Sequence, residues 1–358
     1  MDTKRPGILP GILAIGSANP PNRYPQEQIY NLAAKYSAFY QNARIRQIFL
    51  NSDIDFRHLY LDAESFASLE TVDQLHERYK RGAVEIGVEA IEKCLSAGGV
   101  TPASVDCIIA VSCTGYLCPG LAELYIRELG LRNDVQRADL LGMGCAGAMP
   151  GLQRAFDFVR SYPDRKALVV AIEICSACYY LDDSLETVVG NAICGDGAAA
   201  VLVGMTDSSA TPKISRFDTH LEPSMIETVG FEQRQGMLRI ILSKDIRDLA
   251  GGLAGALINR MLDRAQLSKD QINHWILHSG GRKVIDNIQS ELGLTDDQVR
   301  HSKHVLRNFG NMSSPTVLFV LEQVMHETGA GLRATPGDKG IMLALGPGLA
   351  VEGALLEW

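Results

Sequence analysis

Three residues that can take part in nucleophilic catalysis lie far apart in the chain, each in an apolar or glycine-rich segment. Cys145 lies within LLGMGCAGAMPGL (140–152), His278 ends the apolar part of HWILHSGG (274–281), and Asn311 lies near the start of FGNMSSPTVLFVLEQV (309–324). A cysteine supplies a nucleophile, a histidine supplies a base or a cationic partner, and an asparagine supplies an amide donor. The combination favours nucleophilic catalysis by Cys145.

Each of these residues also has a structural interpretation. A cysteine in a tightly packed turn is commonly just buried, and a single histidine at a strand end is more often structural. A thiol at the start of a helix, however, faces unpaired N–H groups and the positive end of the helix dipole, which favour the thiolate. The helix-like segment AMPGLQRAFDFVRS follows Cys145 directly, and flanking glycines permit close approach by a substrate.

The elements that must position these residues follow an alternating pattern. Apolar, β-branched runs at 107–115, 167–177 and 198–205 predict buried strands, and the segment 74–99 has a helical pattern. Alternating strands and helices indicate an α/β fold. In such folds, sites lie at the carboxyl ends of strands, which is where His278 is expected.

The same order of features occurs twice. A short capped helix, a polar residue and a strand ending in small residues are found in VTPASVDCIIAVSCTG (100–115) and again in LSKDQINHWILHSGG (267–281). Nearly the same offset relates Asp106 to Asn273 and Cys145 to Asn311. We therefore predict two duplicated α/β halves, 1–215 and 216–358, that share one core. The loops carrying Cys145 and Asn311 would meet near the pseudo-twofold axis.

Composition limits the classes of function. The 358 residues are 46% hydrophobic and 21% charged with a net charge of −8, which is typical of a globular protein and argues against general nucleic-acid binding. No segment resembles a signal peptide, and no apolar run approaches the ~20 residues needed to span a bilayer. A cytoplasmic protein that acts neither on nucleic acid nor in a membrane is expected.

The eight cysteines lie mostly in or beside apolar segments, so we expect free thiols. Cys175 and Cys178 form a single C-x-x-C, which could be a redox pair or half of a zinc site. No second C-x-x-C or H-x-x-x-H supplies further ligands, so packing or pocket lining is favoured. The sequence contains neither a phosphate-binding G-x-x-x-x-G-K-[ST] loop nor a convincing metal cluster.

At this point the motifs resemble those of the thiolase-fold ketosynthases, and specifically the type III polyketide synthases related to chalcone synthase. The resemblance covers nearly the whole chain in order and rests on GMGCAGAMPGL, ICGDGAAA (193–200), HSGGRKVID, FGNMSSPTVLFVLE and the closing GPGLAVEGALL. It implies a thiolase-like fold in which two pseudo-repeated α/β halves pack as a layered αβαβα core. It also implies a homodimer.

The resemblance implies a decarboxylating acyltransferase. Cys145, stabilised as a thiolate by cationic His278, would carry the acyl chain, while His278 and Asn311 would stabilise the enolate formed from malonyl-CoA. Decarboxylation drives the new carbon–carbon bond, so the expected substrates are CoA thioesters and the expected cofactors are none. The expected partners are malonyl-CoA and, in some members, another acyl-CoA starter.

Binding residues are also implied by the resemblance. Arg44 and Arg46 fall where relatives place cations that bind CoA, although Gln47 and Asn51 replace residues that are often cationic there, and a solvated helix face is the alternative for this segment. The pair Gly280 and Gly281 matches the loop beside the pantetheine arm.

The implied pocket departs from the plant pattern. Cys194 replaces a gatekeeping phenylalanine before GDG, and Ile240 aligns loosely with a second aromatic gate. Positions that match cavity-lining residues are Cys113, Cys118, Cys175, Cys178 and Ser313, with Cys118 expected to reach the partner's cavity across the dimer interface. Because these two gate positions lack aromatic rings, the sequence does not determine the cavity volume or the chain length of the product.

Within the family, segments 45–61, 112–121, 274–286 and 299–314 resemble those of bacterial dihydroxyphenylacetyl-CoA synthases. This implies condensation of four malonyl units into 3,5-dihydroxyphenylacetyl-CoA. Alternatives that stay open are polyketide synthases of alkylresorcinol, pyrone or tetrahydroxynaphthalene type, some of which take a fatty-acyl starter, and a ketoacyl synthase III. A noncatalytic thiol or metal-binding protein is the alternative outside enzymes. A papain-like hydrolase also has Cys, His and Asn, but the duplication and composition oppose it.

Overall fold

A nine-stranded mixed sheet carries the candidate site in the computed structural model, which describes residues 8–61, 70–243, 246–329 and 333–358. The strand order is β11-β12-β13-β8-β1-β7-β6-β4-β5. The bounds of these strands are β1 Leu9–Ala18, β4 Cys107–Ser112, β5 Gln136–Leu141, β6 Ala167–Ile174, β7 Asp196–Thr206, β8 Lys213–His220, β11 His274–Leu277, β12 Lys339–Gly346 and β13 Ala350–Glu357.

Strand order repeats between the two parts of the chain, as the sequence predicted. Each set contains four strands. From the middle of the sheet outward, their spatial order is first, fourth, third and second in chain order, which gives β1-β7-β6-β4 in one set and β8-β13-β12-β11 in the other. The two sets join where β1 and β8 run antiparallel, with Gly11 opposite Lys213. Strand β5 lies at the edge and extends the first set only.

Two residues at the starts of equivalent strands make equivalent contacts. The Asp106 carboxylate accepts from the Lys166 backbone N–H at 3.0 Å, and the Asp106 N–H donates to the Lys166 carbonyl at 3.0 Å. In the second set, Asn273 makes the same pair of contacts with Lys339, both at 2.9 Å. A side chain that holds the neighbouring strand in register explains why the sequence keeps a polar residue at these two corresponding positions.

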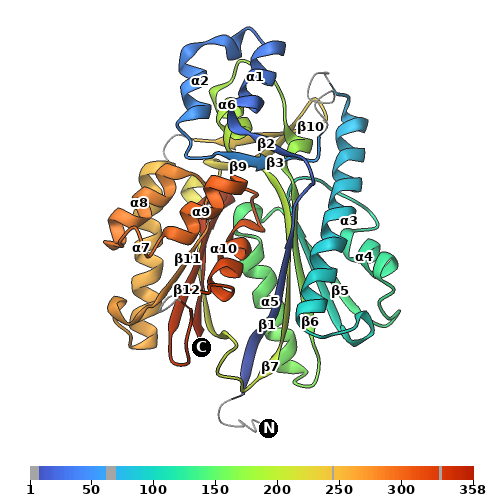
Figure 1. The fold of residues 1–358 in the computed structure, drawn as a ribbon, viewed down its shortest axis with the longest axis vertical. Helices are drawn as coiled ribbons and strands as arrows, with labels where there is room; N and C mark the ends of the chain where they lie inside the picture. The colour runs from blue at the N-terminus through green and yellow to red at the C-terminus, as the bar shows by residue number, and fades with distance from the viewer. Residues whose placement is uncertain (1–7, 62–69, 244–245, 330–332) are drawn as a thin grey trace.

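Helices cover both outer faces of the sheet sets and fill the space between them (Figure 1). Helices α3 (Val72–Ala97) and α4 (Leu121–Leu129) pack on the first set, and α7 (Ile246–Ala265) and α8 (Arg282–Leu292) on the second. The central pair, α5 (Ala148–Ser161) and α10 (Thr316–Met325), contacts strands of both sets. The result is the layered arrangement that the sequence predicted.

Each interface between layers has its own apolar core. The central one contains Leu152 of α5, Leu318 of α10, Val111 of β4 and Met342 of β12, all buried. A second core lies under α3 and α4, and a third under α7 and α8. Strands β4, β6 and β7 are covered on both sides, so their sequences read as continuous apolar runs.

A smaller cap sits above one end of the sheet, at the top of Figure 1. It consists of helices and short strands around a fourth apolar core that includes Tyr40 and Phe49. Its elements are α1 Gln26–Tyr36, α2 Ala43–Leu50, α6 Leu185–Ile193, β2 Arg23–Pro25, β3 Phe56–His58, β9 Val229–Arg234 and β10 Met237–Leu242. Helix α9 (Arg300–Phe309) lies between this cap and α10 and contacts both β3 and α10.

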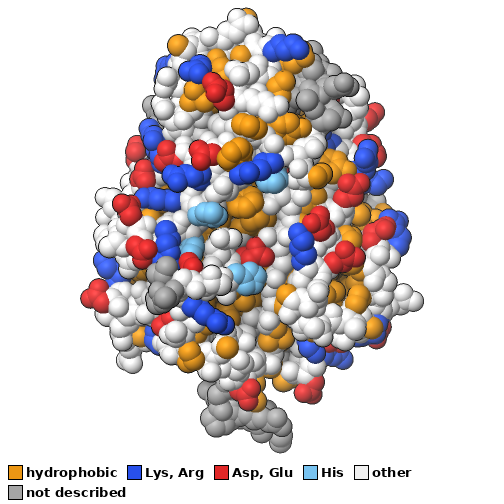
Figure 2. Space-filling view, viewed as in Figure 1, with side chains coloured by type: hydrophobic (Ala, Val, Ile, Leu, Met, Phe, Trp, Pro, Cys, Tyr) orange, Lys and Arg blue, Asp and Glu red, His pale blue; other side chains and the backbone are white. Residues whose placement is uncertain are grey.

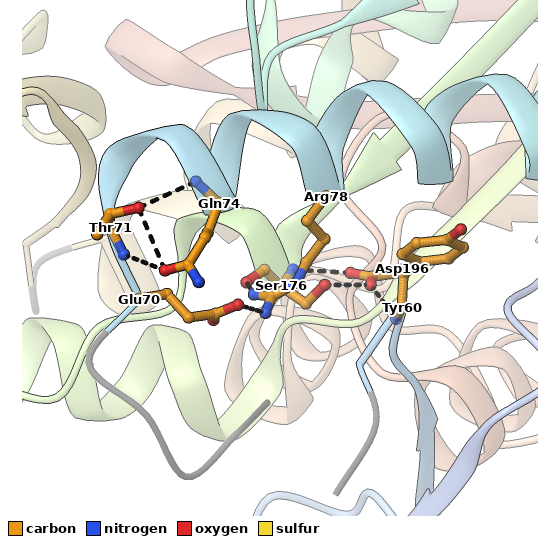
Figure 3. Close-up of polar contacts among 7 residues, drawn as sticks. All are labelled: Tyr60, Glu70, Thr71, Gln74, Arg78, Ser176 and Asp196. Atoms are coloured by element: carbon orange, nitrogen blue, oxygen red, sulfur yellow. Dashed lines mark hydrogen bonds and ion pairs between the residues drawn. The ribbon is translucent and has the colours of Figure 1, made fainter. Parts of the chain in front are cut away.

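The predicted elements differ from the structure mainly at their ends. The apolar run 167–177 leaves the sheet after Ile174, and Cys175–Cys178 form a 3₁₀ turn, η5. Asp196 explains this early end because its carboxylate accepts from the Ser176 N–H at 2.8 Å and from the Ser176 hydroxyl at 2.6 Å (Figure 3). Among the described residues, no helix is both long enough and apolar enough to cross a membrane.

Candidate active site

Cys145 lies in a one-turn 3₁₀ helix, η4 (Gly144–Ala146), directly before α5. This confirms the helix predicted after the cysteine. Gly144 has φ +52°, and a Cβ at that position would collide with the ring of Pro347 in the closing segment of the chain. Glycine is therefore required for the turn that points Cys145 between the two halves.

Asn311 reaches the same point from the second half. Its side-chain Nδ2 lies 3.9 Å from the Cys145 Sγ and donates to the Gly280 carbonyl at 3.3 Å. Its Oδ1 accepts from the Ser313 backbone N–H at 2.8 Å and lies 4.0 Å from the Cys145 Sγ, so both ends of the amide border the thiol. The amide N–H₂ group is thus directed at the space beside Cys145, where it can donate to a substrate oxygen.

His278 follows β11 directly, at the strand end predicted from the sequence. Its backbone N–H donates to the Leu343 carbonyl at 2.8 Å, and its side chain is buried. A Cβ added to Gly280 would lie 3.3 Å from the imidazole Nε2, so the ring borders the same loop that accepts from Asn311. Within the described part of the chain, neither ring nitrogen has a hydrogen-bond partner. Both nitrogens are buried, so the ring keeps unused hydrogen-bonding capacity next to the Gly280 loop.

Burial controls the charge state of the two titratable groups. It raises the pKa of the Cys145 thiol to about 12, against the opposing effects of hydrogen bonds with Ser313 and Asn311. It also lowers the pKa of His278 to about 4. Burial by itself therefore favours a neutral thiol and a neutral imidazole, and the thiolate–imidazolium pair that the resemblance implied stays a prediction.

Glu173 is a site residue that the sequence analysis missed. Its fully buried carboxylate accepts from the backbone N–H of Cys113 at 2.9 Å, from the Thr114 hydroxyl at 2.8 Å and from the Ser314 hydroxyl at 2.6 Å. It thereby ties the end of β4 to the turn after Asn311. Burial raises the pKa of this carboxyl. The available signal was a single acidic residue in the otherwise apolar run ALVVAIEI (167–174).

Several predicted pocket residues surround this centre. The Cys113 thiol lies 3.4 Å from the Ser313 hydroxyl, and Cys194 pairs with Asn311 as an isolated parallel β-bridge. In η5, Cys175 is buried, and the Cys178 thiol donates to the Thr114 carbonyl at 3.6 Å. These contacts place Cys113 and Cys194 beside the turn that carries Asn311, and Cys178 beside the segment that follows β4.

Two other predicted pocket residues lie further out. Ile240, on β10, packs against Gly190 of α6, where an added Cβ would lie 3.0 Å from its Cγ2. Cys118 is exposed in the connection between β4 and α4, just before Pro119. Within this single chain, Cys118 lies on the surface, so its predicted role across a dimer interface remains a prediction.

The turn η5 is held by a polar cluster drawn in Figure 3. Asp196, the aspartate of the GDG motif, also accepts from the backbone N–H of Tyr60 at 2.7 Å, and burial raises its pKa to about 6. Arg78 of α3 donates to the Ser176 carbonyl at 2.9 Å and forms an ion pair with Glu70. Asp196 of the GDG motif and Arg78 of α3 therefore both bind Ser176, which lies within the turn Cys175–Cys178.

The predicted CoA-binding cations lie in the cap, on α2, and not beside Cys145. Arg44 and Arg46 are exposed, and Arg46 forms an ion pair with Glu27 at 2.9 Å. On the same helix, Asn51 Nδ2 donates to Gln47 Oε1 at 2.7 Å, so the two neutral replacements bond to each other.

A further cation approaches this region from the opposite side. Arg282 at the start of α8, immediately after Gly280 and Gly281, lies 3.6 Å from Asp53 in the loop that follows α2. Figure 2 shows that basic side chains gather along the band where the cap meets α8 and α9. Cations of both α2 and α8 therefore lie near the junction between the cap and the second half.

Comparisons with known proteins agree with this arrangement. The chalcone and stilbene synthase family models match two parts of the chain, the N-terminal domain model residues 7–207 and the C-terminal domain model residues 226–358. A 3,5-dihydroxyphenylacetyl-CoA synthase of Streptomyces toyocaensis is 34% identical, over 98% of this chain and 90% of the relative. A 1,3,6,8-tetrahydroxynaphthalene synthase of Streptomyces peucetius subsp. caesius is 32% identical, over 97% and 93%. The crystal structure of PKS-I from the brown alga Ectocarpus siliculosus superposes with a TM-score of 0.92 at 26% identity, covering 99% of this chain and all of that one.

Proposed function

The chain belongs to the chalcone and stilbene synthase family and is a type III polyketide synthase, and we propose that it builds 3,5-dihydroxyphenylacetyl-CoA from four malonyl-CoA units. The observation that best supports the chemistry is the Asn311 amide, held 3.9 Å from a half-buried thiol at a helix start and beside an unpartnered imidazole. The product is supported by the 34% identity to dihydroxyphenylacetyl-CoA synthases over nearly the whole chain.

In the loading step, the Cys145 sulfur attacks the thioester carbonyl of an acyl-CoA. The carbon–sulfur bond to CoA breaks, and the thiol proton passes through His278 to the departing CoA sulfur. A neutral imidazole is the right form for this task because it accepts a proton first and then gives it up. Burial keeps His278 in this neutral form but also weakens it as a base, so in the proposed step proton transfer is concerted with attack of the sulfur on the carbonyl.

In the extension step, malonyl-CoA loses CO₂, and the electron pair of the broken carbon–carbon bond passes to the thioester enolate. Donors that face the developing oxyanion stabilise this charge most strongly in a buried site. Asn311 Nδ2 and the ring N–H of the neutral His278 are the proposed donors. The enolate carbon then attacks the Cys145 thioester, the cysteine sulfur leaves, and the lengthened chain is reloaded on Cys145 before the next extension.

The finer assignments belong to the same proposal. CoA phosphates would be bound by Arg44, Arg46 and the cations of α8, with Gly280 and Gly281 beside the pantetheine arm. The active form would be a cytoplasmic homodimer without a bound cofactor, in which Cys118 reaches the partner's cavity. The halves 1–215 and 216–358 would contribute the nucleophile and the His–Asn pair, respectively.

Pocket shape is the feature that would change the product. Cys194 and Ile240 have smaller side chains than the aromatic gates of plant relatives, which would leave room for a longer or differently folded intermediate. Tetrahydroxynaphthalene is therefore the second candidate product, supported by the 32% identity to a synthase of that type. Both candidates use malonyl-CoA and differ in extension number and ring closure.

The deciding experiment is incubation of the purified chain with malonyl-CoA alone, followed by mass spectrometry of the products. We expect 3,5-dihydroxyphenylacetyl-CoA and its free acid. Tetrahydroxynaphthalene would select the second candidate. A requirement for a fatty-acyl or aromatic starter would overturn the malonyl-only proposal, although the family would stand.

The nucleophile is tested separately by Cys145→Ala. Without the thiol, no acyl chain can be held between extensions, so we expect no polyketide product at all. The matched control is Cys94→Ala, which removes a buried thiol on α3 that hydrogen-bonds Ala14, outside the site. Polyketide formation by Cys145→Ala would show that another group carries the chain.

A further inference from the structure

Arg57 is a fully buried cation close to the candidate site, and neither the mechanism nor the motifs account for it. It lies on β3 in the cap. Its Nη1 donates to the carbonyls of Asn191 at 2.6 Å and Cys194 at 2.7 Å, and to the Tyr179 hydroxyl at 2.7 Å. Its Nε donates to Gln26 Oε1 at 2.9 Å. All four acceptors are uncharged, so the guanidinium is stabilised by oriented dipoles instead of by a carboxylate.

Burying an arginine in this way is costly unless its hydrogen bonds do something that an apolar side chain could not. Two of the bonded carbonyls lie at the end of α6, where the last carbonyls of a helix have no partner within the helix. Gln26 extends the same contact, because its Nε2 donates to the Ala192 carbonyl at 2.7 Å. A cation at a helix C-terminus is also favoured by the helix dipole.

The segment that Arg57 holds is the one on which Asn311 rests. The Asn311 backbone N–H donates to the Ile193 carbonyl at 2.8 Å, and the Asn311 carbonyl accepts from the Gly195 N–H at 2.9 Å. Cys194, between these two contacts, is the residue whose carbonyl Arg57 binds. Arg57 is therefore one hydrogen bond removed from the backbone that places the Asn311 amide beside the thiol.

Arg57 also touches the other end of this connection. Gly310 has φ +72°, and a Cβ at that position would lie 2.9 Å from Arg57 Cδ and 2.6 Å from the Ile193 carbonyl oxygen. The arginine stem and the 191–194 segment thus enclose the backbone just before Asn311. Tyr179 completes the arrangement, because its hydroxyl lies 2.5 Å from the Cys194 carbonyl.

From these contacts we infer that Arg57 is a positioning residue for the decarboxylation step. It fixes the backbone of Cys194 and, through it, the distance between the Asn311 amide and the reacting oxygen. The inference rests on the proposed function, in which Asn311 is an oxyanion donor. Arg57 itself touches neither substrate nor thiol in this account.

The test uses Arg57→Lys, which keeps the charge but loses the planar fork that binds several acceptors at once. Small displacements of catalytic groups reduce rate strongly, so we expect kcat for malonyl-CoA decarboxylation to fall about 10- to 100-fold. KM for malonyl-CoA should stay within about twofold, since the CoA contacts are untouched, and alkylation of Cys145 by iodoacetamide should keep its wild-type rate. A purely structural Arg57 would lower the melting temperature and leave kcat per folded molecule unchanged.

Two further variants keep the inference decidable. Tyr179→Phe removes one hydrogen bond to the Cys194 carbonyl without altering a buried charge, so it should fold and lower kcat to a smaller extent. Arg264→Lys is the matched control, since Arg264 on α7 pairs with buried Asp218 far from the site and should retain wild-type kcat. Wild-type kcat in Tyr179→Phe and in folded Arg57→Lys would overturn the inference. Wild-type turnover of malonyl-CoA, measured in the same assay, tests the proposed function independently.

Discussion

At the scale of single residues, the site depends on where one amide points. Asn311 Oδ1 accepts from the Ser313 N–H, which leaves Nδ2 as the end of the amide that can donate beside the Cys145 thiol. The glycine-rich loop contributes as well, because the Gly280 carbonyl accepts from the same Nδ2. An aspartate here would offer an acceptor where a donor is required, so the residue type follows from the direction of charge development.

Asn311→Ala should therefore reduce the decarboxylation rate more than substrate binding. Loss of one oxyanion donor typically lowers kcat about 10²- to 10³-fold, and we expect a reduction in this range with a nearly unchanged KM for malonyl-CoA. Steady-state kinetics of CO₂ release provides the measurement. Iodoacetamide alkylation of Cys145 serves as a control for an intact thiol. A variant that releases CO₂ at the wild-type rate would remove Asn311 from the mechanism.

The buried imidazole gives a prediction about stability and pH. Burial lowers the pKa of His278 from 6.5 to about 4 in the folded chain. Between these values the unfolded chain binds more protons, so the free energy of unfolding rises with pH, and His278's contribution is lost as the pH falls from 6.5 toward 4. The loss between pH 7 and pH 5 amounts to about 2 kcal/mol.

The check is the difference between wild type and His278→Gln in urea unfolding at pH 7 and pH 5. The wild type should lose about 2 kcal/mol more than the variant over this interval. His58 and His301, whose pKa values burial also lowers, are present in both proteins and cancel in the difference. Equal losses in the two proteins would mean that His278 titrates normally in the folded state.

At the scale of elements, the sequence predicted the strand–helix order and the residues that meet at the centre. Strand β4 and helix α5 begin where the patterns placed them, and Asn311 lies opposite Cys145 because both halves repeat the same unit. Periodicity carries this information because it records which faces are buried. The turn η5 was not predicted, since it depends on a hydrogen bond from Ser176 to Asp196, which is remote in sequence.

The role of Glu173 and Arg57 could not be predicted for the same reason. Each is a charged side chain whose acceptors or donors come from several elements, so its purpose appears only when those elements are assembled. Local sequence indicates only that a charge stands in an apolar or mixed setting. The hydrogen bond between Gln47 of α2 and Asn51, which follows the helix, likewise became visible only in the structure.

The start of α8 supplies a prediction about substrate recognition. Arg282 approaches Asp53 from α8, close to the predicted CoA-binding segment, and we expect it to bind a phosphate of CoA. A charge-assisted hydrogen bond contributes about 1.5–3 kcal/mol, so Arg282→Ala should raise KM for malonyl-CoA roughly tenfold or more. Malonyl N-acetylcysteamine has no phosphates, and its kinetics should not change.

The comparison of these two substrates is internally controlled. Lys303→Ala provides a matched surface change on α9, because Lys303 pairs with exposed Asp296. It should alter neither KM. If Arg282→Ala affects both substrates equally, the arginine acts on the loop containing Gly280 and Gly281 instead of on a phosphate.

At the scale of the whole molecule, the two halves are joined by a core that neither could bury alone. Helices α5 and α10 lie between the strand sets, and the central core takes Leu152 and Val111 from the first half and Leu318 and Met342 from the second. Cys145 lies just before α5, and Asn311 lies just before α10, so both residues stand at the starts of the two central helices. Catalytic geometry and the interface between halves are therefore one structural unit.

This sharing predicts cooperative unfolding across the proposed boundary near residue 215. Leu152 is fully buried in the central core, so Leu152→Ala should destabilise the protein by about 2–5 kcal/mol through lost burial and the cavity left behind. Because strands of both halves line that cavity, calorimetry should show a single transition in both proteins, shifted to lower temperature in the variant.

Tryptophan fluorescence reports specifically on the second half, since Trp275 and Trp358 both lie there. Its transition should move together with the far-ultraviolet circular dichroism. Two separate transitions, with the fluorescence signal unshifted by a substitution in α5, would establish that the halves unfold independently and that the Cys145–Asn311 geometry is set by docking of two autonomous units.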